Sequence, residues 1–304
     1  MFDLFFCFLG IFFGFFLGLI PGMHINNFLP FLIFLPFTST QFFFFVISAS
    51  VSFAFSSFFP SILLGVPNQD TALNVLPGHR LVLEGRAYTA LVLSLLGGLF
   101  ALFFSVFFLF LFLFFLPVLY PFIRLLIPFL LVIICIIILI SDRKPVFIVF
   151  FLSSVLGFLT FSYDLLLPLL SGFFGLSTLL ISVMRNPSIP MQVPRFNSTL
   201  SFFKIIRCSF ISCFLSSIFG LIPAVSSTIS ACTGKIFGKL NSEEFITLLG
   251  GTNVIYMIYS FFTFFLVRIT RSGSAVFLAK IMESQNILFS FGIILFSGVI
   301  AALL

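Results

Sequence analysis

Gly18-Leu19-Ile20-Pro21-Gly22-Met23-His24 closes an apolar run and opens a more polar stretch, and Gly220-Leu221-Ile222-Pro223-Ala224-Val225-Ser226 does the same late in the chain. Proline removes a backbone hydrogen-bond donor and glycine frees the backbone, so we expect a helix to end at each corner. Transporters whose helices are interrupted at corresponding points of two halves build a solute site between them. The two corners therefore predict a membrane carrier with a two-fold internal repeat.

The composition of the chain indicates a membrane protein. Of its 304 residues, 61% are hydrophobic and 7% are charged, and the mean hydropathy is +1.34. Such a chain cannot give a soluble domain a polar surface, and long apolar runs are the signature of membrane-crossing helices. The net charge is +6, with the charges in short loops, so we expect the lipid bilayer and no nucleic acid as a partner.

Apolar runs predict an all-α, polytopic fold with about nine spanning helices. They lie near 4–20, 42–65, 87–116, 122–141, 146–163, 165–183, 205–222, 245–267 and 285–304. The runs that follow the corners, 25–37 and 225–238, are too short to cross and predict re-entrant or half helices. The segment 87–116 is long for one crossing, and Gly97-Gly98 is where a break would fall.

No linker or charge block divides the chain, so we take 1–304 as a single membrane transport domain. The first repeat covers about 4–116, the middle spans 122–183 and the second repeat about 205–304.

Basic residues predict the orientation in the cell membrane. With nine spans, the loops on one side hold Arg80, Arg86, Arg143, Lys144, Arg185, Arg195, Lys204, Arg268, Arg271 and Lys280. The positive-inside rule then places these loops and the N-terminus of this multi-pass protein in the cytoplasm. The same count makes the two repeats parallel, and an error of one span would invert one copy. Lys235, Lys239, Glu243 and Glu244 are typical of a solvated cluster at the membrane edge.

The first candidate site lies at the two corners. A half helix that starts near His24 would present free N–H groups and the positive end of its dipole, which is typical of an anion site. The substrate-binding residues expected at the first corner are Pro21, Gly22, His24, Asn26 and Asn27, and those at the second corner are Pro223, Ser226, Ser227 and Thr228. The alternative for either corner alone is a capped turn at the membrane surface.

The second candidate site is the polar stretch 65–86. Its expected binding residues are Pro67, Asn68, Asp70, Thr71, Gly78, His79 and Arg80. The planar guanidinium of Arg80 can hold a carboxylate or phosphate through two hydrogen bonds. Asp70 and Glu84 are alternative partners for the arginines, and an ordinary loop that only sets topology is the other interpretation. Asn253, inside the apolar run 245–267, either lines the cavity or joins helices.

Motifs of catalysis and metal binding are missing from the sequence. There is no H-E-x-x-H, no G-x-S-x-G and no G-x-x-x-x-G-K-[ST]. His24 and His79 are its two histidines, and its five cysteines form no C-x-x-C pair. We therefore predict that the protein is not an enzyme and holds neither metal nor cofactor, with Na⁺ or H⁺ as the coupling ion.

Several motifs resemble the large membrane subunit of the tripartite tricarboxylate transporters, especially its archaeal branch. These are the Gly-Leu-Ile-Pro-Gly corner, Gly65-Val66-Pro67 ending in Thr71-Ala72, Leu76-Pro77-Gly78-His79-Arg80, and Gly85-Arg86-Ala87. The resemblance covers roughly 10–100 and 205–285. The positions that carry over are Pro21, Gly22, Pro67, Thr71, Gly78 and Gly85, whereas Phe59-Pro60-Ser61 replaces a Gly-Gly-Ser-like stretch.

This resemblance implies a permease for small organic anions, such as di- or tricarboxylates, that is driven by an ion gradient. It also implies two partners, a small membrane subunit and an extracytoplasmic binding protein.

Two other functions fit the same residues. A lipid-phosphate translocase, for example for a polyisoprenyl phosphate, would use the same donors, because phosphate and carboxylate bind alike. It needs a groove open sideways to lipid, whereas a carboxylate carrier needs an enclosed aqueous cavity. A membrane-embedded lipid-modifying enzyme would need a nucleophile or metal cluster that the sequence does not show.

Overall fold

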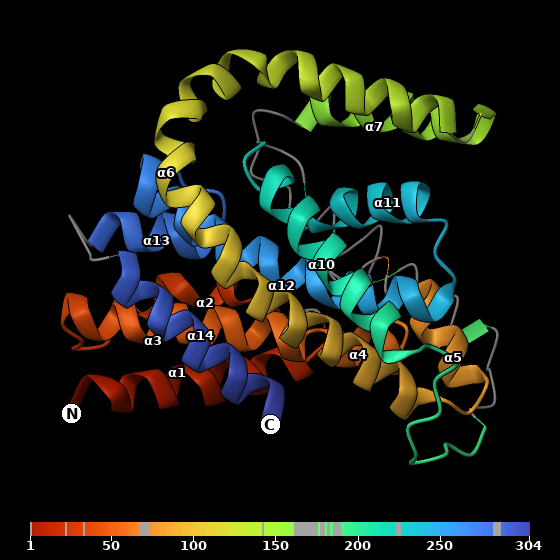
Figure 1. Ribbon diagram of the computed structural model, residues 1–304, viewed down its shortest axis with the longest axis horizontal. Helices are drawn as coiled ribbons and strands as arrows, with labels where there is room; N and C mark the ends of the chain where they lie inside the picture. Colours follow the sequence, from red (N-terminus) through yellow and green to blue (C-terminus); the bar gives the residue numbers. More distant parts are fainter. Residues whose placement is uncertain are drawn as a thin grey trace.

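The computed structural model describes residues 2–21, 23–32, 34–66, 73, 75–141, 143–160, 176, 180, 183–184, 190–222, 226–281 and 287–304. Every regular element within these ranges is a helix, which confirms the all-α prediction (Figure 1).

The first structural unit is formed by α1 (Phe2–Leu19), α2 (Ile25–Leu32), α3 (Ser39–Ser56) and α4 (Phe58–Leu63). Helices α1 and α3 run parallel, because Gly10 lies against Phe45 and Gly14 against Ala49. A Cβ atom at either glycine would meet a backbone carbonyl of α3, so only glycine allows this close approach. Since α1 and α3 point the same way, the segment that contains α2 must return to the end of the molecule where α1 began.

The second unit has the same order of elements: α10 (Phe202–Phe219), α11 (Ser227–Gly238) and α12 (Ser242–Val267). Here too the long helices are parallel, because Ser212 lies against Gly251 and Gly220 is close to Tyr259. The short helix α11 runs between them and is joined to α10 by the hydroxyls of Ser216 and Ser230, 3.1 Å apart.

The two units run in opposite directions. Asn253 of α12 contacts Ala54 near the end of α3, whereas Phe265 of α12 stacks on Phe43 near the start of α3, with ring centroids 6.0 Å apart. The prediction of parallel copies is therefore wrong. The span count treated α1 as one complete crossing, but the returning segment around α2 brings the chain back to its starting side.

Helix α6 (Ala87–Ser141) joins two predicted spans, 87–116 and 122–141, into one bent helix that is followed by α7 (Arg143–Thr160). The break expected at Gly97-Gly98 is absent, because these glycines instead allow the backbone of α12 to approach at Thr247. Figure 1 shows α6 reversing its direction between its two arms, and Pro117, Pro121 and Pro128 lie within the helix. Proline removes a helix hydrogen bond and bends the backbone.

The glycine contact between α6 and α12 can be tested by substitution. Gly97→Ala is expected to lower the free energy of unfolding by about 1–3 kcal/mol, because the new methyl group meets the backbone oxygen of Thr247, which cannot rotate away. Gly157→Ala is the matched control, since a Cβ atom there has nothing within 4 Å. Thermal unfolding in detergent measures both variants. Equal midpoints for the two would contradict this packing.

The remaining described elements are η2 (Val75–His79), a π-helix, α5 (Arg80–Leu83), α13 (Gly273–Ile281) and α14 (Ile287–Leu303). Helix α14 is joined to α3 by the hydroxyls of Ser297 and Ser48, 2.9 Å apart, and α13 is joined to α3 by Ser274 and Ser50, 2.8 Å apart. The core is therefore centred on α3 and α12, whose side chains are almost all buried.

Four helical stretches of the described residues are long and apolar enough to cross a membrane: Ser39–Leu63, Ala87–Ile136, Phe202–Phe219 and Ser242–Val267. Leu4–Leu19, Val146–Thr160 and Ser290–Leu303 are shorter apolar helices. The predicted span 165–183 lies almost wholly outside the described residues. The predicted count of nine therefore stays a prediction.

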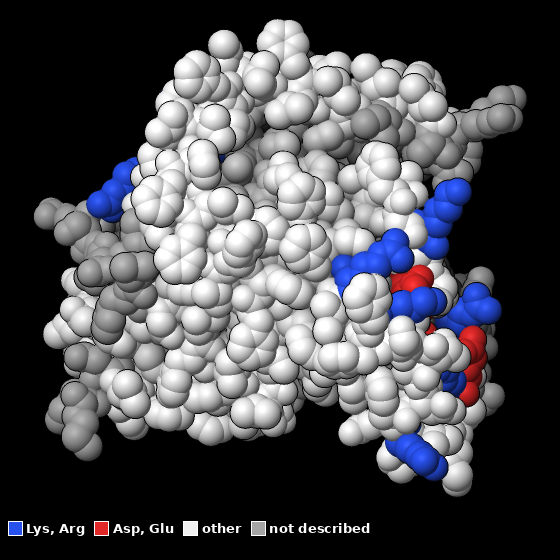
Figure 2. Space-filling view, in the orientation of Figure 1, with Lys and Arg blue, Asp and Glu red and all other residues white. Residues whose placement is uncertain are grey.

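Most of the charged side chains visible in Figure 2 lie at one end of the molecule, the end of α5, and a broad uncharged surface covers the middle. The N-terminus lies at the opposite end, since Phe6 of α1 packs on Phe37 just before α3, while α4 leads to α5. The expectation that the N-terminus shares a side with Arg80 and Arg86 is therefore wrong, for the same reason as the direction of the repeats.

Candidate functional site

The first corner folds as the sequence predicts, with a short helix that begins just after His24. The backbone N–H of Asn26 donates to Nδ1 of His24 (3.1 Å), and the imidazole ring packs on Phe53 with centroids 4.9 Å apart. His24 therefore caps α2 and ties its start to α3. The side chains of Asn26 and Asn27 are exposed, as is Pro21, and Gly22 lies outside the described residues.

The second corner presents the start of α11. Ser226 is the N-cap residue in an extended conformation, and its side chain makes no capping hydrogen bond. Ser227 is buried, and Oγ1 of Thr228 is buried without a hydrogen-bond partner among the described residues. Pro223 lies outside the described residues. In the first turn of α11, the Thr228 hydroxyl is thus a buried polar group with hydrogen-bonding capacity that no described residue uses.

Asn253 lies near the middle of α12 and connects the two units. Its buried Nδ2 donates to the carbonyl of Ala54 (3.1 Å) and to the hydroxyl of Ser57 (3.4 Å), at the junction of α3 and α4. The carbonyl of the preceding residue, Thr252, accepts a hydrogen bond from Ser216 of α10 (3.4 Å). Asn253 therefore joins helices, and it does so where the first unit meets the second.

The second candidate site is described only in part. Pro67, Asn68, Asp70 and Thr71 lie outside the described residues. Gly78 packs against Ile62, and Nδ1 of His79 lies 3.2 Å from the carbonyl oxygen of Ile62, so this π-helical turn is fixed to α4. The side chain of Arg80 is 72% exposed and pairs with Glu84 at 3.2 Å. The structure thus places Arg80 at the charged end of the molecule, beside the carboxylate that the sequence offered as its alternative partner.

A buried ion pair between Arg86 and Glu243 was missed by the sequence analysis. The Glu243 carboxylate also accepts hydrogen bonds from the Ser198 hydroxyl (2.7 Å) and the Thr199 backbone N–H (2.9 Å), and Arg86 donates to the Asn197 carbonyl (2.6 Å). The network joins the starts of α6 and α12 to the connector before α10. Glu243 and Glu244 are 5% and 8% exposed, so the expected solvated cluster is wrong for these two residues.

The sequence does carry a signal for the helix position of Glu243. Asn241 and Glu244 form a capping box, with the Asn241 side chain accepting from the Glu244 N–H at 2.9 Å. This pattern marks a helix N-terminus, and it places Glu243 within the first turn, where a carboxylate is favoured by the helix dipole.

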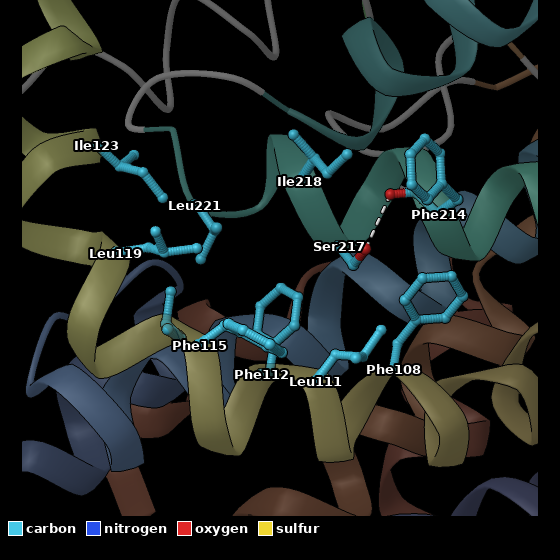
Figure 3. A pocket seen from close by; sticks show the side chains of 11 residues that line it. Phe108, Leu111, Phe112, Phe115, Leu119, Ile123, Phe214, Ser217, Ile218 and Leu221 are labelled. Atoms are coloured by element: carbon cyan, nitrogen blue, oxygen red, sulfur yellow. Dashed lines mark hydrogen bonds between the residues drawn. The ribbon is translucent and has the colours of Figure 1, made fainter.

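An apolar groove lies between the first arm of α6 and the end of α10 (Figure 3). Its volume is about 200 Å³. The Ser217 hydroxyl, which is the polar side-chain group in its lining, already donates to the Phe214 carbonyl (2.8 Å). The groove is lined by Phe108, Leu111, Phe112, Phe115, Leu116, Leu119, Ile123, Phe214, Ser217, Ile218 and Leu221. Such a lining suits hydrocarbon and offers nothing to a free carboxylate.

In the described part of the chain, no three His, Cys, Asp or Glu side chains lie close enough together to hold a metal ion.

Comparison with known proteins identifies the family. The family model described as "Tripartite tricarboxylate transporter TctA family" matches residues 4–304. An uncharacterized protein of Methanocaldococcus jannaschii is 30% identical over 322 aligned positions, which cover 100% of this chain and 79% of that protein. No solved structure matches the chain. The resemblance read from the two ends of the sequence is thus confirmed over nearly its whole length, and the chain belongs to the tripartite tricarboxylate transporter TctA family, a family of membrane transport permeases.

Proposed function

We propose that this permease carries small organic anions of the di- or tricarboxylate type across the cell membrane, coupled to a Na⁺ or H⁺ gradient. The observation that carries the proposal is the pair of oppositely directed units, each a helix, a corner, a short helix and a long helix, that meet at Asn253. Inverted units with interrupted helices are the architecture in which secondary transporters alternate between two access states.

The substrate carboxylates are proposed to bind at the starts of α2 and α11. Each start has a positive dipole end, and Thr228 adds a buried hydroxyl with no partner among the described residues. The proposed binding residues are those of the two corners, together with Asn253 and the stretch 67–80.

The same proposal covers location and partners. The described basic residues at the α5 end include Arg80, Arg86 and Lys204. The positive-inside rule therefore favours a cytoplasmic α5 end and an N-terminus on the opposite side. As the family works in a tripartite system, we propose a small membrane subunit and an extracytoplasmic binding protein as partners.

Lipid-phosphate translocation is the second candidate function. The observation that favours it is the apolar groove between α6 and α10, whose rim residues are exposed.

Uptake by purified protein in proteoliposomes tests the proposal. A panel of radiolabelled di- and tricarboxylates, under an imposed Na⁺ or H⁺ gradient, is expected to include at least one anion that accumulates only when the gradient is present. Protein-free liposomes and liposomes without a gradient are the controls. Movement of a labelled lipid phosphate between leaflets, with no carboxylate uptake, would contradict carboxylate transport and support the second candidate.

A further inference from the structure

One end of the apolar groove meets the half-buried guanidinium group of Arg271. Nη2 of Arg271 donates to the Leu221 carbonyl (2.7 Å) and to the Tyr120 hydroxyl (3.0 Å), and its Nε is buried with no hydrogen-bond partner among the described residues. Leu221 lines the groove, and Tyr120 lies on α6 between the lining residues Leu119 and Ile123. Arg271 therefore places a positive charge, and an Nε–H that no described residue accepts from, at one end of the otherwise apolar groove.

The charge of Arg271 has no carboxylate partner in the described part of the structure. The acidic side chains that the structure describes are Glu84, Glu243 and Glu244, and all three pair with basic residues at the α5 end: Arg80, Arg86 and Lys204. Arg124 directly follows the lining residue Ile123, and Arg268 ends α12 three residues before Arg271. Both are exposed. This end of the groove is thus electrostatically complementary to an anion.

Arg271 lies beside the last turns of α12. Helix α12 ends at Val267, and the chain then turns back along it, because the Ser260 hydroxyl donates to the Ser272 hydroxyl (3.0 Å). An arginine at the end of a spanning segment can keep its charge at the membrane surface beside apolar neighbours.

The groove is open on one side. Phe115, Leu119 and Ile218 on its rim are 56%, 47% and 43% exposed, whereas Leu116 and Leu221 on its floor are 3% and 7% exposed. A hydrocarbon chain can therefore enter sideways and rest on a buried floor.

We propose that this groove is a binding site for a membrane lipid with an anionic phosphate headgroup. One hydrocarbon chain lies between α6 and α10, and the phosphate accepts hydrogen bonds from Arg271, with Arg124 and Arg268 adding attraction. Basic pockets between membrane helices bind anionic headgroups in this way. The site does not require the lipid to cross the bilayer. It adjoins the second corner, because Arg271 donates to the Leu221 carbonyl, but it does not include Asn253.

The test measures lipid binding to the full-length protein in detergent by native mass spectrometry. Phosphatidylglycerol is expected to bind, and zwitterionic phosphatidylcholine to bind at least about tenfold more weakly. Arg271→Gln is expected to weaken phosphatidylglycerol binding by roughly tenfold to a hundredfold, the range for loss of a charge-assisted hydrogen bond. Arg195→Gln, an exposed arginine on the connector before α10, is the matched control and is expected to bind normally.

A second variant keeps the test decisive if Arg271→Gln does not fold. Leu119→Trp fills the groove from its exposed rim and is expected to block phosphatidylglycerol without removing a charge. Excess inorganic phosphate is expected not to displace the lipid, because it lacks the chain. Any one of three results would overturn the proposal. They are normal phosphatidylglycerol binding by folded Arg271→Gln or Leu119→Trp, equal binding of phosphatidylcholine, and displacement of the lipid by inorganic phosphate. Asn253→Ala is expected to keep lipid binding, which separates this site from the transport site.

Discussion

An Asn253→Ala variant is expected to take up its organic anion at least about tenfold more slowly than the wild type. The side chain is buried at the meeting point of the two units and bonds Ala54 and Ser57. Removing it takes away an amide donor at the proposed substrate site, and a hydrogen bond to a charged group is worth about 1.5–3 kcal/mol. Initial rates of uptake into proteoliposomes give the measurement, with the amount of inserted protein determined for each sample.

Ser57→Ala separates a transport role of Asn253 from helix packing. This change removes one partner of Asn253 and leaves its amide in place. If Asn253 serves the substrate, Ser57→Ala retains most of its uptake while both variants unfold at similar temperatures. Uptake by Asn253→Ala within twofold of wild type, or equal losses in the two variants, would mean that Asn253 only joins helices.

Glu243→Ala is expected to destabilise the protein by about 3–5 kcal/mol, because it removes the buried carboxylate that Arg86, Ser198 and Thr199 share as an acceptor. The Arg86 side chain is 25% exposed and Glu243 is 7% exposed, so water replaces the lost partner poorly. Thermal unfolding in detergent and the fraction of monodisperse protein after purification report the effect.

The matched control for this ion pair is Glu84→Ala. Glu84 contacts the same arginine at 3.7 Å but is 42% exposed, and exposed pairs contribute about 0–1 kcal/mol. Losses of similar size in the two variants would contradict a special role for the buried pair.

Several helices could be predicted closely from the sequence. The expected span 245–267 is α12, Ser242–Val267, and the expected half helix 225–238 is α11, Ser227–Gly238. These boundaries depend on the length of an apolar run and on proline, glycine and capping residues next to it. All of these act within a few residues of one another, so the sequence shows them directly.

The candidate site was predicted less completely. The corner at His24 and the start of α11 are where the sequence placed them, and Asn253 connects the two units. The buried pair Arg86–Glu243 and the groove beside Arg271 were not foreseen. Each of these joins segments that are far apart along the chain, and no local pattern reports such a pairing.

The amino-acid sequence alone decided that the chain is a helical membrane protein and where its helices are interrupted, because hydrophobicity and proline or glycine act locally. Tertiary contacts decided the direction of the helices. The contacts of Gly10 with Phe45 and of Gly14 with Ala49 make α1 and α3 parallel, so α2 has to return. Tertiary contacts between α12 and α3 invert the second unit. Tertiary contacts also decided that Gly97 packs against α12 instead of breaking α6. A glycine permits both outcomes, and only the surface that it meets selects between them.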